Sequence, residues 1–199
     1  MQVFCLLEML LKKVLIYGRD ELSNARKDMF YIEVFKKLDE KKVRYLIIGG
    51  VAVNLYGFPR MTLDLDLMID LKDEFNVGRF IESINELNFK PVISGVNVND
   101  FAVTSKRDLW KKEKNMEVFS FYNPAREIER VDVMIENYID FDEAYAKRKE
   151  FEVEGILIML ASIDDIIKLK KISNRKRDII DIEALEKIKE IENEKKQRI

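Results

Sequence analysis

The chain of 199 residues contains no histidine and a single cysteine, Cys5. The absence of histidine excludes Ser-His-Asp and Cys-His nucleophilic sites, and it removes the commonest general base in enzymes. One thiol forms no intrachain disulfide, and without histidine it forms no Cys/His zinc site. Catalysis would therefore depend on carboxylates, lysines and metal ions, and a reducing, cytoplasmic location fits this composition best.

Proline and glycine are also scarce, with three and seven residues, and no flexible linker or internal repeat divides the chain. The net charge is −2 although 36% of the residues are charged, so there is no overall basic field of the kind found on dedicated nucleic-acid binders. The 47% of apolar residues suffices for one compact domain. We expect an N-terminal apolar segment over residues 1–28, a core over residues 29–140, and a C-terminal strand and helices over residues 141–199.

Residues 1–17 are rich in apolar side chains and could be mistaken for a signal sequence. Glu8 interrupts this segment, its positive charges follow the apolar stretch, and no small-residue cleavage site comes after it, so it does not fit a secretory signal. It is also too short to span a bilayer. We interpret it as an amphipathic helix or strand that packs on the domain or on a second copy, which would make the protein a homodimer, and we expect no membrane partner.

The spacing of apolar residues predicts an α/β (α+β) chain. Helices are expected over residues 23–41, 49–56, 72–87, 105–114, 140–149, 162–172 and 175–195. Strands are expected over residues 43–48, 63–69, 116–122, 127–135 and 151–160. Ser23 and Ser162 are the expected N-caps, and the last strand is either continuous or a hairpin through Gly155. The expected fold is a short, mixed, mostly antiparallel sheet with helices packed on one side and helical C-terminal elements closing a cleft.

Residues 62–66, Thr-Leu-Asp-Leu-Asp, lie in an expected strand. Alternate side chains of a strand share a face, so Thr62, Asp64 and Asp66 line one side and the leucines line the other. Two carboxylates about 7 Å apart along a strand repel each other unless a divalent cation lies between them. Taken alone, the pattern also fits a half-exposed strand with acidic residues on its wet face.

Gly49 and Gly50 follow the apolar run over residues 45–48 and open an expected helix. Free backbone N–H groups at a positive helix terminus suit a di- or triphosphate, and glycine allows close approach. Glycines also serve simply to make a tight turn, and Arg60, which lies between this turn and the acidic strand, also fits an ordinary surface position. The order of these features predicts a phosphate cradle beside a metal-binding face.

Asp132 is a third candidate ligand, because it is flanked by apolar residues in an expected strand. If this strand lies beside residues 63–69, Asp132 would join Asp64 and Asp66 in holding two Mg²⁺ ions, one on a triphosphate and one at an attacking hydroxyl. An acid on an exposed edge strand is the alternative.

Gly49-Gly50, Asp64-x-Asp66 and the later apolar-Asp132-apolar strand together resemble the DNA polymerase β-type nucleotidyltransferase superfamily. Within it, residues 49–66 look most like the minimal, AbiEii-like nucleotidyltransferases, the toxin arm of type IV toxin–antitoxin systems. The C-terminal stretch Asp-Ile-Ile-Lys-Leu-Lys over residues 165–170, followed by Arg-Lys-Arg-Asp-Ile-Ile-Asp over residues 175–181, is similar to a pattern of the same group.

The resemblance implies a role for each of these positions. It assigns phosphate or nucleotide binding to Gly49, Gly50, Arg60, Thr62 and Asp178. It assigns catalysis to Asp64, Asp66, Asp132 and Lys170, of which the three aspartates would be the metal ligands. Lys170 would contact the phosphates or the acceptor and would be oriented by Asp178 or Asp181. Because Lys168 and Lys171 are close by, a solvated helix face is the alternative.

The reaction implied is transfer of an NMP from an NTP to a hydroxyl acceptor with release of pyrophosphate, with two Mg²⁺ ions, or Mn²⁺, as cofactor. A toxin-like acceptor would be tRNA or a protein, with an antitoxin as partner. Two alternatives stay open: a small-molecule transferase of the aminoglycoside or lincosamide type, and a non-catalytic binding module on the same fold.

Two local basic clusters bear on the acceptor. One covers residues 168–177, and the other consists of Lys106, Arg107, Trp110, Lys111, Lys112 and Lys114. Cations interleaved with an aromatic ring suit a single-stranded RNA or a tRNA end, although a solvated helix surface also fits.

Overall fold

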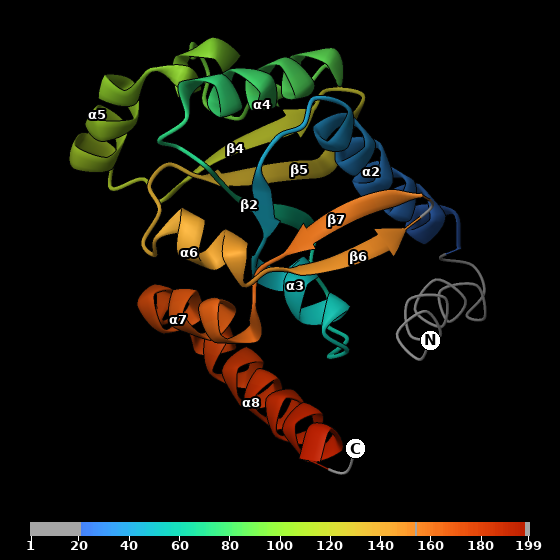
Figure 1. Cartoon of the computed structure of the whole chain (residues 1–199). Coiled ribbons are helices and arrows are strands. Elements are labelled where there is room, and N and C mark those ends of the chain that lie inside the picture. The colour runs from blue at the N-terminus through green and yellow to red at the C-terminus, as the bar shows by residue number, and fades with distance from the viewer. Residues whose placement is uncertain (1–20, 154, 198–199) are drawn as a thin grey trace.

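The computed structural model describes residues 21–153 and 155–197 (Figure 1). Residues 1–20, most of the expected N-terminal segment, lie outside the described part. Helix α2 (Glu21–Glu40) runs across the expected boundary between residues 28 and 29. The expectation that Ser23 caps this helix is wrong, because Ser23 lies inside it.

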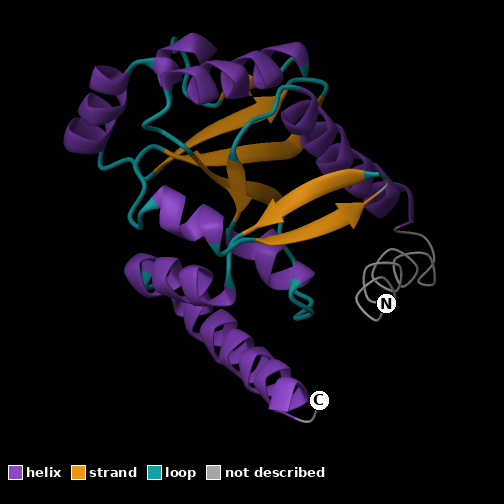
Figure 2. Cartoon of the chain, viewed as in Figure 1, coloured by secondary structure: helices purple, strands orange, loops and turns teal. Residues whose placement is uncertain are grey.

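The α/β fold class is confirmed (Figure 2). After α2 the helices are α3 (Gly49–Leu55), α4 (Glu74–Glu86), the 3₁₀ helix η1 (Val98–Ala102), α5 (Thr104–Lys114), α6 (Phe141–Ala146), α7 (Ile163–Ser173) and α8 (Lys176–Gln197). The strands are β1 (Tyr45–Ile47), β2 (Asp64–Ile69), β3 (Lys90–Pro91), β4 (Val118–Asn123), β5 (Arg126–Met134), β6 (Lys149–Val153) and β7 (Ile156–Leu160). The short elements η1 and β3 were not expected, and α6 is shorter than expected because Lys149 already begins β6.

The strands form a seven-stranded sheet in the order β3-β4-β5-β2-β1-β7-β6. The pairs β1–β2, β3–β4, β4–β5 and β6–β7 are antiparallel, whereas β1–β7 and β2–β5 are parallel. The expected mixed, mostly antiparallel sheet is therefore confirmed. The segment over residues 151–160 resolves into the β6–β7 hairpin, with Gly155 at φ +77°.

The register of the central strands gives the sheet two unlike faces. Leu65 lies opposite Val131, and the two form part of an apolar face, because paired residues of neighbouring strands point to the same side. Asp66 lies opposite Asp132, and Ser120 on β4 lies opposite Asp132 from the other side. Asp66, Asp132 and Ser120 thus form a polar row across three strands on the opposite face, with the acidic residues on β2 and β5.

Aromatic rings join the helices to the apolar face of the sheet. Phe80 on α4 and Phe101 on η1 lie against Phe121 and Phe119 of β4, with ring centroids 6.0 Å and 5.7 Å apart respectively. Trp110 on α5 stacks on Phe119 at 4.7 Å. This face is therefore closed by helices, which leaves the acidic face for a ligand.

Burial of Trp110 changes the interpretation of the basic cluster on α5. Trp110 is only 6% exposed, and Arg107 is buried with its Nη1 donating to the Phe101 carbonyl at 2.7 Å. The expectation that Trp110 offers a stacking surface for RNA bases is wrong, because its ring fills the hydrophobic core. Only the lysines of the cluster remain on the surface.

The C-terminal helices lie across the other side of the sheet from α4 and α5 (Figure 1). Ser162 caps α7 as expected, its Oγ accepting from the Asp165 N–H at 3.2 Å. Asn174 takes a left-handed conformation, with φ 49°, and so lets the chain turn sharply into α8. None of the helices in the described ranges is both long and apolar enough to cross a membrane.

Replacing Phe101 by alanine should lower the free energy of unfolding by about 3–5 kcal/mol, because it leaves a cavity between α4, α5 and the sheet. Phe75→Ala is the matched control. It deletes the same atoms from a side chain on α4 that is 83% exposed, so it leaves no cavity in the core. Urea unfolding measures both values. Equal losses for the two variants would contradict the packing described here.

Candidate active site

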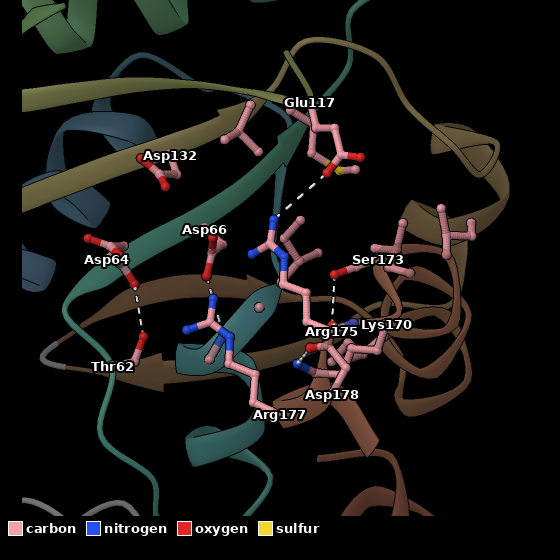
Figure 3. Close-up of a pocket in the computed structure, with 18 of the residues that line it drawn as sticks. Thr62, Asp64, Asp66, Glu117, Asp132, Lys170, Ser173, Arg175, Arg177 and Asp178 are labelled. Atoms are coloured by element: carbon pink, nitrogen blue, oxygen red, sulfur yellow. Dashed lines mark hydrogen bonds and ion pairs between the residues drawn. The ribbon is translucent and has the colours of Figure 1, made fainter. Parts of the chain in front are cut away.

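A cavity of about 390 Å³ opens between the acidic face of the sheet and helices α7 and α8 (Figure 3). Its lining includes every residue that we expect to catalyse the reaction, to bind the nucleotide or to hold a metal: Gly49, Gly50, Arg60, Thr62, Asp64, Asp66, Asp132, Lys170 and Asp178. These positions span more than half the chain, so the fold gathers them from the β1–α3 turn, β2, β5, α7 and α8.

The β1–α3 turn is pressed against the acidic strand. Gly49 has φ +64°, and a Cβ on it would lie 1.9 Å from Asp66 Oδ2. A Cβ on Gly50 would lie 2.6 Å from Thr62 Oγ1. The Gly50 N–H donates to Asp66 Oδ2 at 3.3 Å. Only glycine fits at these two positions, because any Cβ would clash with Asp66 or Thr62. The same lack of side chains would allow a ligand to approach the backbone closely.

Asp66 lies in an environment that disfavours its charge. Burial and the charge of the neighbouring Asp132 together raise the pKa of Asp66 to about 6, and the hydrogen bond from Gly50 opposes the shift. Asp66 is therefore mostly ionised at neutral pH in an environment that disfavours its charge, and a bound cation would compensate that charge.

Asp132 has an unsatisfied oxygen. Its Oδ1 is buried, and no hydrogen-bond partner for it occurs among the described residues. Burial raises the pKa of Asp132 above its usual value, and a hydrogen bond with Ser120 lowers it. A buried polar atom without a partner in the protein is normally satisfied by a ligand, an ion or water.

The carboxylates of Asp64, Asp66 and Asp132 are candidate ligands of a cation. Within residues 21–153 and 155–197, no three acidic or other ligating side chains already converge on one point. Asp64, Asp66 and Asp132 nevertheless share one face, two of them have raised pKa values, and Asp132 Oδ1 is unsatisfied. Such an all-oxygen set fits a hard divalent cation such as Mg²⁺ or Mn²⁺.

Lys170 is held by both of the aspartates named as alternatives. Its Nζ lies 2.6 Å from Asp181 Oδ2 and 3.3 Å from Asp178 Oδ1. Asp178 Oδ2 also accepts from Ser173 Oγ at 2.7 Å and from the Arg175 N–H at 3.0 Å. The register of the lysines is thereby fixed, with Lys170 turned into the cavity.

Arg60 is not an ordinary surface residue. Its Nη1 lies 2.5 Å from Asp181 Oδ2, and its side chain is 16% exposed. Asn54 on α3 holds its backbone on both sides, accepting from the Arg60 N–H at 2.8 Å and donating to the Arg60 carbonyl at 3.0 Å. The guanidinium is thus fixed beside the glycine turn.

Several cavity residues had no individual role assigned from the sequence, among them Glu117, Tyr138, Arg175 and Arg177. Arg175 Nη2 lies 3.8 Å from Glu117 Oε2, joining the α7–α8 connection to the start of β4. Both arginines belong to the basic cluster over residues 168–177, one of the two candidate acceptor contacts in the sequence. Glu117 and Tyr138 carry no local signal, because only the fold brings them to the cavity.

Comparisons with known proteins give structural likeness without sequence likeness. No family model and no curated protein matches the chain. The lincosamide antibiotic adenylyltransferase LnuA, in its lincomycin-bound structure, aligns with a TM-score of 0.52 and 16% identity over 81% of this chain and 96% of its own. ANT(2'')-Ia in complex with adenylyl-2''-tobramycin aligns with a TM-score of 0.51 and 14% identity over 85% of this chain and 97% of its own. The chain has the nucleotidyltransferase fold. At these identities the likeness establishes the fold and not the substrate.

Asp66→Asn should stabilise the metal-free protein by about 2 kcal/mol at about pH 7.5. The pKa of Asp66 is raised to about 6 in the folded chain, so its stabilising contribution is complete below about pH 4, its unfolded pKa, and is lost as the pH rises through about 6. Urea unfolding with EDTA should show the variant's advantage growing over this window. Asp108→Asn, at an exposed position on α5, is the control, and an advantage independent of pH would contradict the prediction.

Gly49→Ala should destabilise the protein by about 2–4 kcal/mol, because the new Cβ meets Asp66 and the backbone is left-handed there. Gly78→Ala is the matched control, since a Cβ on Gly78 in α4 meets no described atom within 4 Å. In a helix this change should be neutral or stabilising by up to about 1 kcal/mol. Thermal unfolding of both variants distinguishes the two cases, and an unchanged Gly49→Ala protein would be inconsistent with the turn geometry.

Proposed function

We propose that the chain is a metal-dependent nucleotidyltransferase that moves an NMP from an NTP to a hydroxyl acceptor with release of pyrophosphate. The observation that carries this proposal is the pairing of Asp66 with Asp132 on adjacent parallel strands, with Asp132 Oδ1 buried and unsatisfied among the described residues. A non-catalytic module on the same fold has no use for carboxylates whose charge is uncompensated.

Asp64, Asp66 and Asp132 are the residues that would hold Mg²⁺ or Mn²⁺. A divalent cation there would neutralise the negative charge that makes phosphates resist attack. Transfer of a nucleotidyl group otherwise needs in-line positioning and little covalent help, so the lack of histidine is no obstacle.

The order of the strands separates two ends of the cavity. The Gly49-Gly50 turn lies on the β1 side of β2, where Arg60 and Lys170 are also fixed. This end combines glycine backbone with two cations, which suits the triphosphate of the NTP. Arg175 and Arg177 are further cations of the cavity lining.

The acceptor belongs on the other side of β2, where β4 and β5 supply Glu117, Asp132 and Met134. Tyr138 and Ile172 add apolar surface to this end of the lining. Asp132 would accept the proton of the attacking hydroxyl, because burial raises its pKa and its Oδ1 has no hydrogen-bond partner among the described residues.

Two acceptor classes compete. The resemblance of the motifs to AbiEii-like toxins supports tRNA or a protein as acceptor, an antitoxin as partner and action in the cytoplasm. The structural likeness to transferases solved with lincomycin or adenylylated tobramycin supports a small molecule. Glu117, the carboxylate on the acceptor side apart from Asp132, is paired with Arg175, which favours an acceptor less cationic than an aminoglycoside.

Transfer of label from an α-labelled NTP to a tRNA pool, lincomycin or tobramycin in the presence of Mg²⁺ tests the proposal. Asp64→Ala with Asp66→Ala should lower transfer at least about 100-fold, since the divalent cation loses its ligands. Asp108→Asn is the control variant and should retain full activity. If the wild type binds no NTP better than the double variant does and releases no pyrophosphate with any acceptor, the proposed function is wrong.

A further inference from the structure

A single carboxylate oxygen joins two cavity cations. Asp181 Oδ2 lies 2.5 Å from Arg60 Nη1 and 2.6 Å from Lys170 Nζ, and the Asp181 side chain is 3% exposed. Arg60 precedes β2 in the core, Lys170 lies on α7 and Asp181 lies on α8. One buried anion therefore fixes two cations that the sequence separates by 110 positions.

Asp181 contacts these two cations from outside the cavity lining. Arg60 and Lys170 both line the cavity, whereas Asp181 is not among the described residues that line it. The Arg60 guanidinium also lies against the glycine turn, with its Nη2 3.0 Å from the place of a Cβ on Gly50. The carboxylate thus holds Arg60 beside the turn where the proposed triphosphate end lies, and it holds Lys170 in the lining of the same cavity.

Charge explains why such an anchor is needed. Two cations in a shielded place repel each other strongly, and a shared carboxylate offsets that repulsion. Asp178 adds a second carboxylate on Lys170, so the four groups are formally neutral without a ligand. The cations can therefore stay in position in the free protein, which lowers the cost of ordering them on binding.

We infer that Asp181 is a positioning residue that aims Arg60 and Lys170 at the β- and γ-phosphates of the nucleotide, and that it thereby couples nucleotide binding to the docking of α8 on the core. The inference rests on the proposed function. It predicts that Asp181 contributes to affinity in proportion to the phosphates present, which a residue with only a structural role would not do.

The test uses the full chain, Mg²⁺ and the α,β-methylene analogues of ATP, GTP, CTP and UTP in turn, with binding measured by calorimetry. Asp181→Asn should weaken the analogue that binds best at least tenfold and should leave binding of the corresponding NMP within about twofold. Asp181→Glu keeps the charge and should restore part of the affinity for the analogue.

Asp165→Asn is the matched control. Asp165 is also a buried carboxylate on the C-terminal helices, 3.0 Å from Lys168 Nζ and 2.6 Å from Ser162 Oγ, but it is not among the described residues of the cavity lining. Its replacement should lower the free energy of unfolding without changing affinity for the analogue. Equal affinity of folded Asp181→Asn and wild type would overturn the inference while the proposed function stands.

Hydrogen exchange of the wild type tests the coupling without any variant, and so covers the case in which Asp181→Asn does not fold. Exchange of the amides over residues 178–182 should slow severalfold when the analogue is bound. Binding without such slowing would overturn the coupling. A wild type that binds none of the four analogues with Mg²⁺ would overturn the proposed function itself, which is a different result from either.

Discussion

The in-register parallel pairing of β2 with β5 is the constraint on which the rest of the structure depends. It places Asp66 opposite Asp132 on one face of the sheet. On the other face it places Leu65 and Leu67 opposite Val131 and Val133. Because a strand alternates its side chains, the same register that seals the apolar face under α4 and η1 concentrates acids on the face left open. A shift by one residue would bury the carboxylates and expose the core.

The C-terminal helices turn this open face into a cavity. The carboxylates of the sheet bring negative charge to the cavity, whereas Arg175 in the α7–α8 connection and Arg177 in the first turn of α8 bring positive charge to the same space. Asp178 and Asp181 offset part of the positive charge on this side of the cavity, since each forms an ion pair with Lys170. The two halves of the cavity are thus complementary in charge before any ligand is present.

Much of this arrangement could be predicted from the sequence, because its signals are local. Alternating side chains predicted β2 and β5, and Ser162 predicted the start of α7. Trp110 was misinterpreted because an aromatic among lysines looks alike whether its ring faces solvent or the core. Glu117 and Tyr138 could not be predicted as cavity residues, since only long-range packing brings them there.

The closeness of Gly49 to β2 bears on how distant sequences of this fold should be compared. A Cβ on Gly49 would lie 2.6 Å from the Cβ of Asp66 as well as 1.9 Å from its carboxylate. Any side chain at position 66 therefore keeps a glycine at position 49, whether or not it is acidic. In related sequences, a glycine at this position therefore indicates that the strand and the turn pack in the same way, whereas only the aspartates indicate that the chemistry is kept. A chain that retains the glycine and has lost the aspartates would be a folded pseudoenzyme.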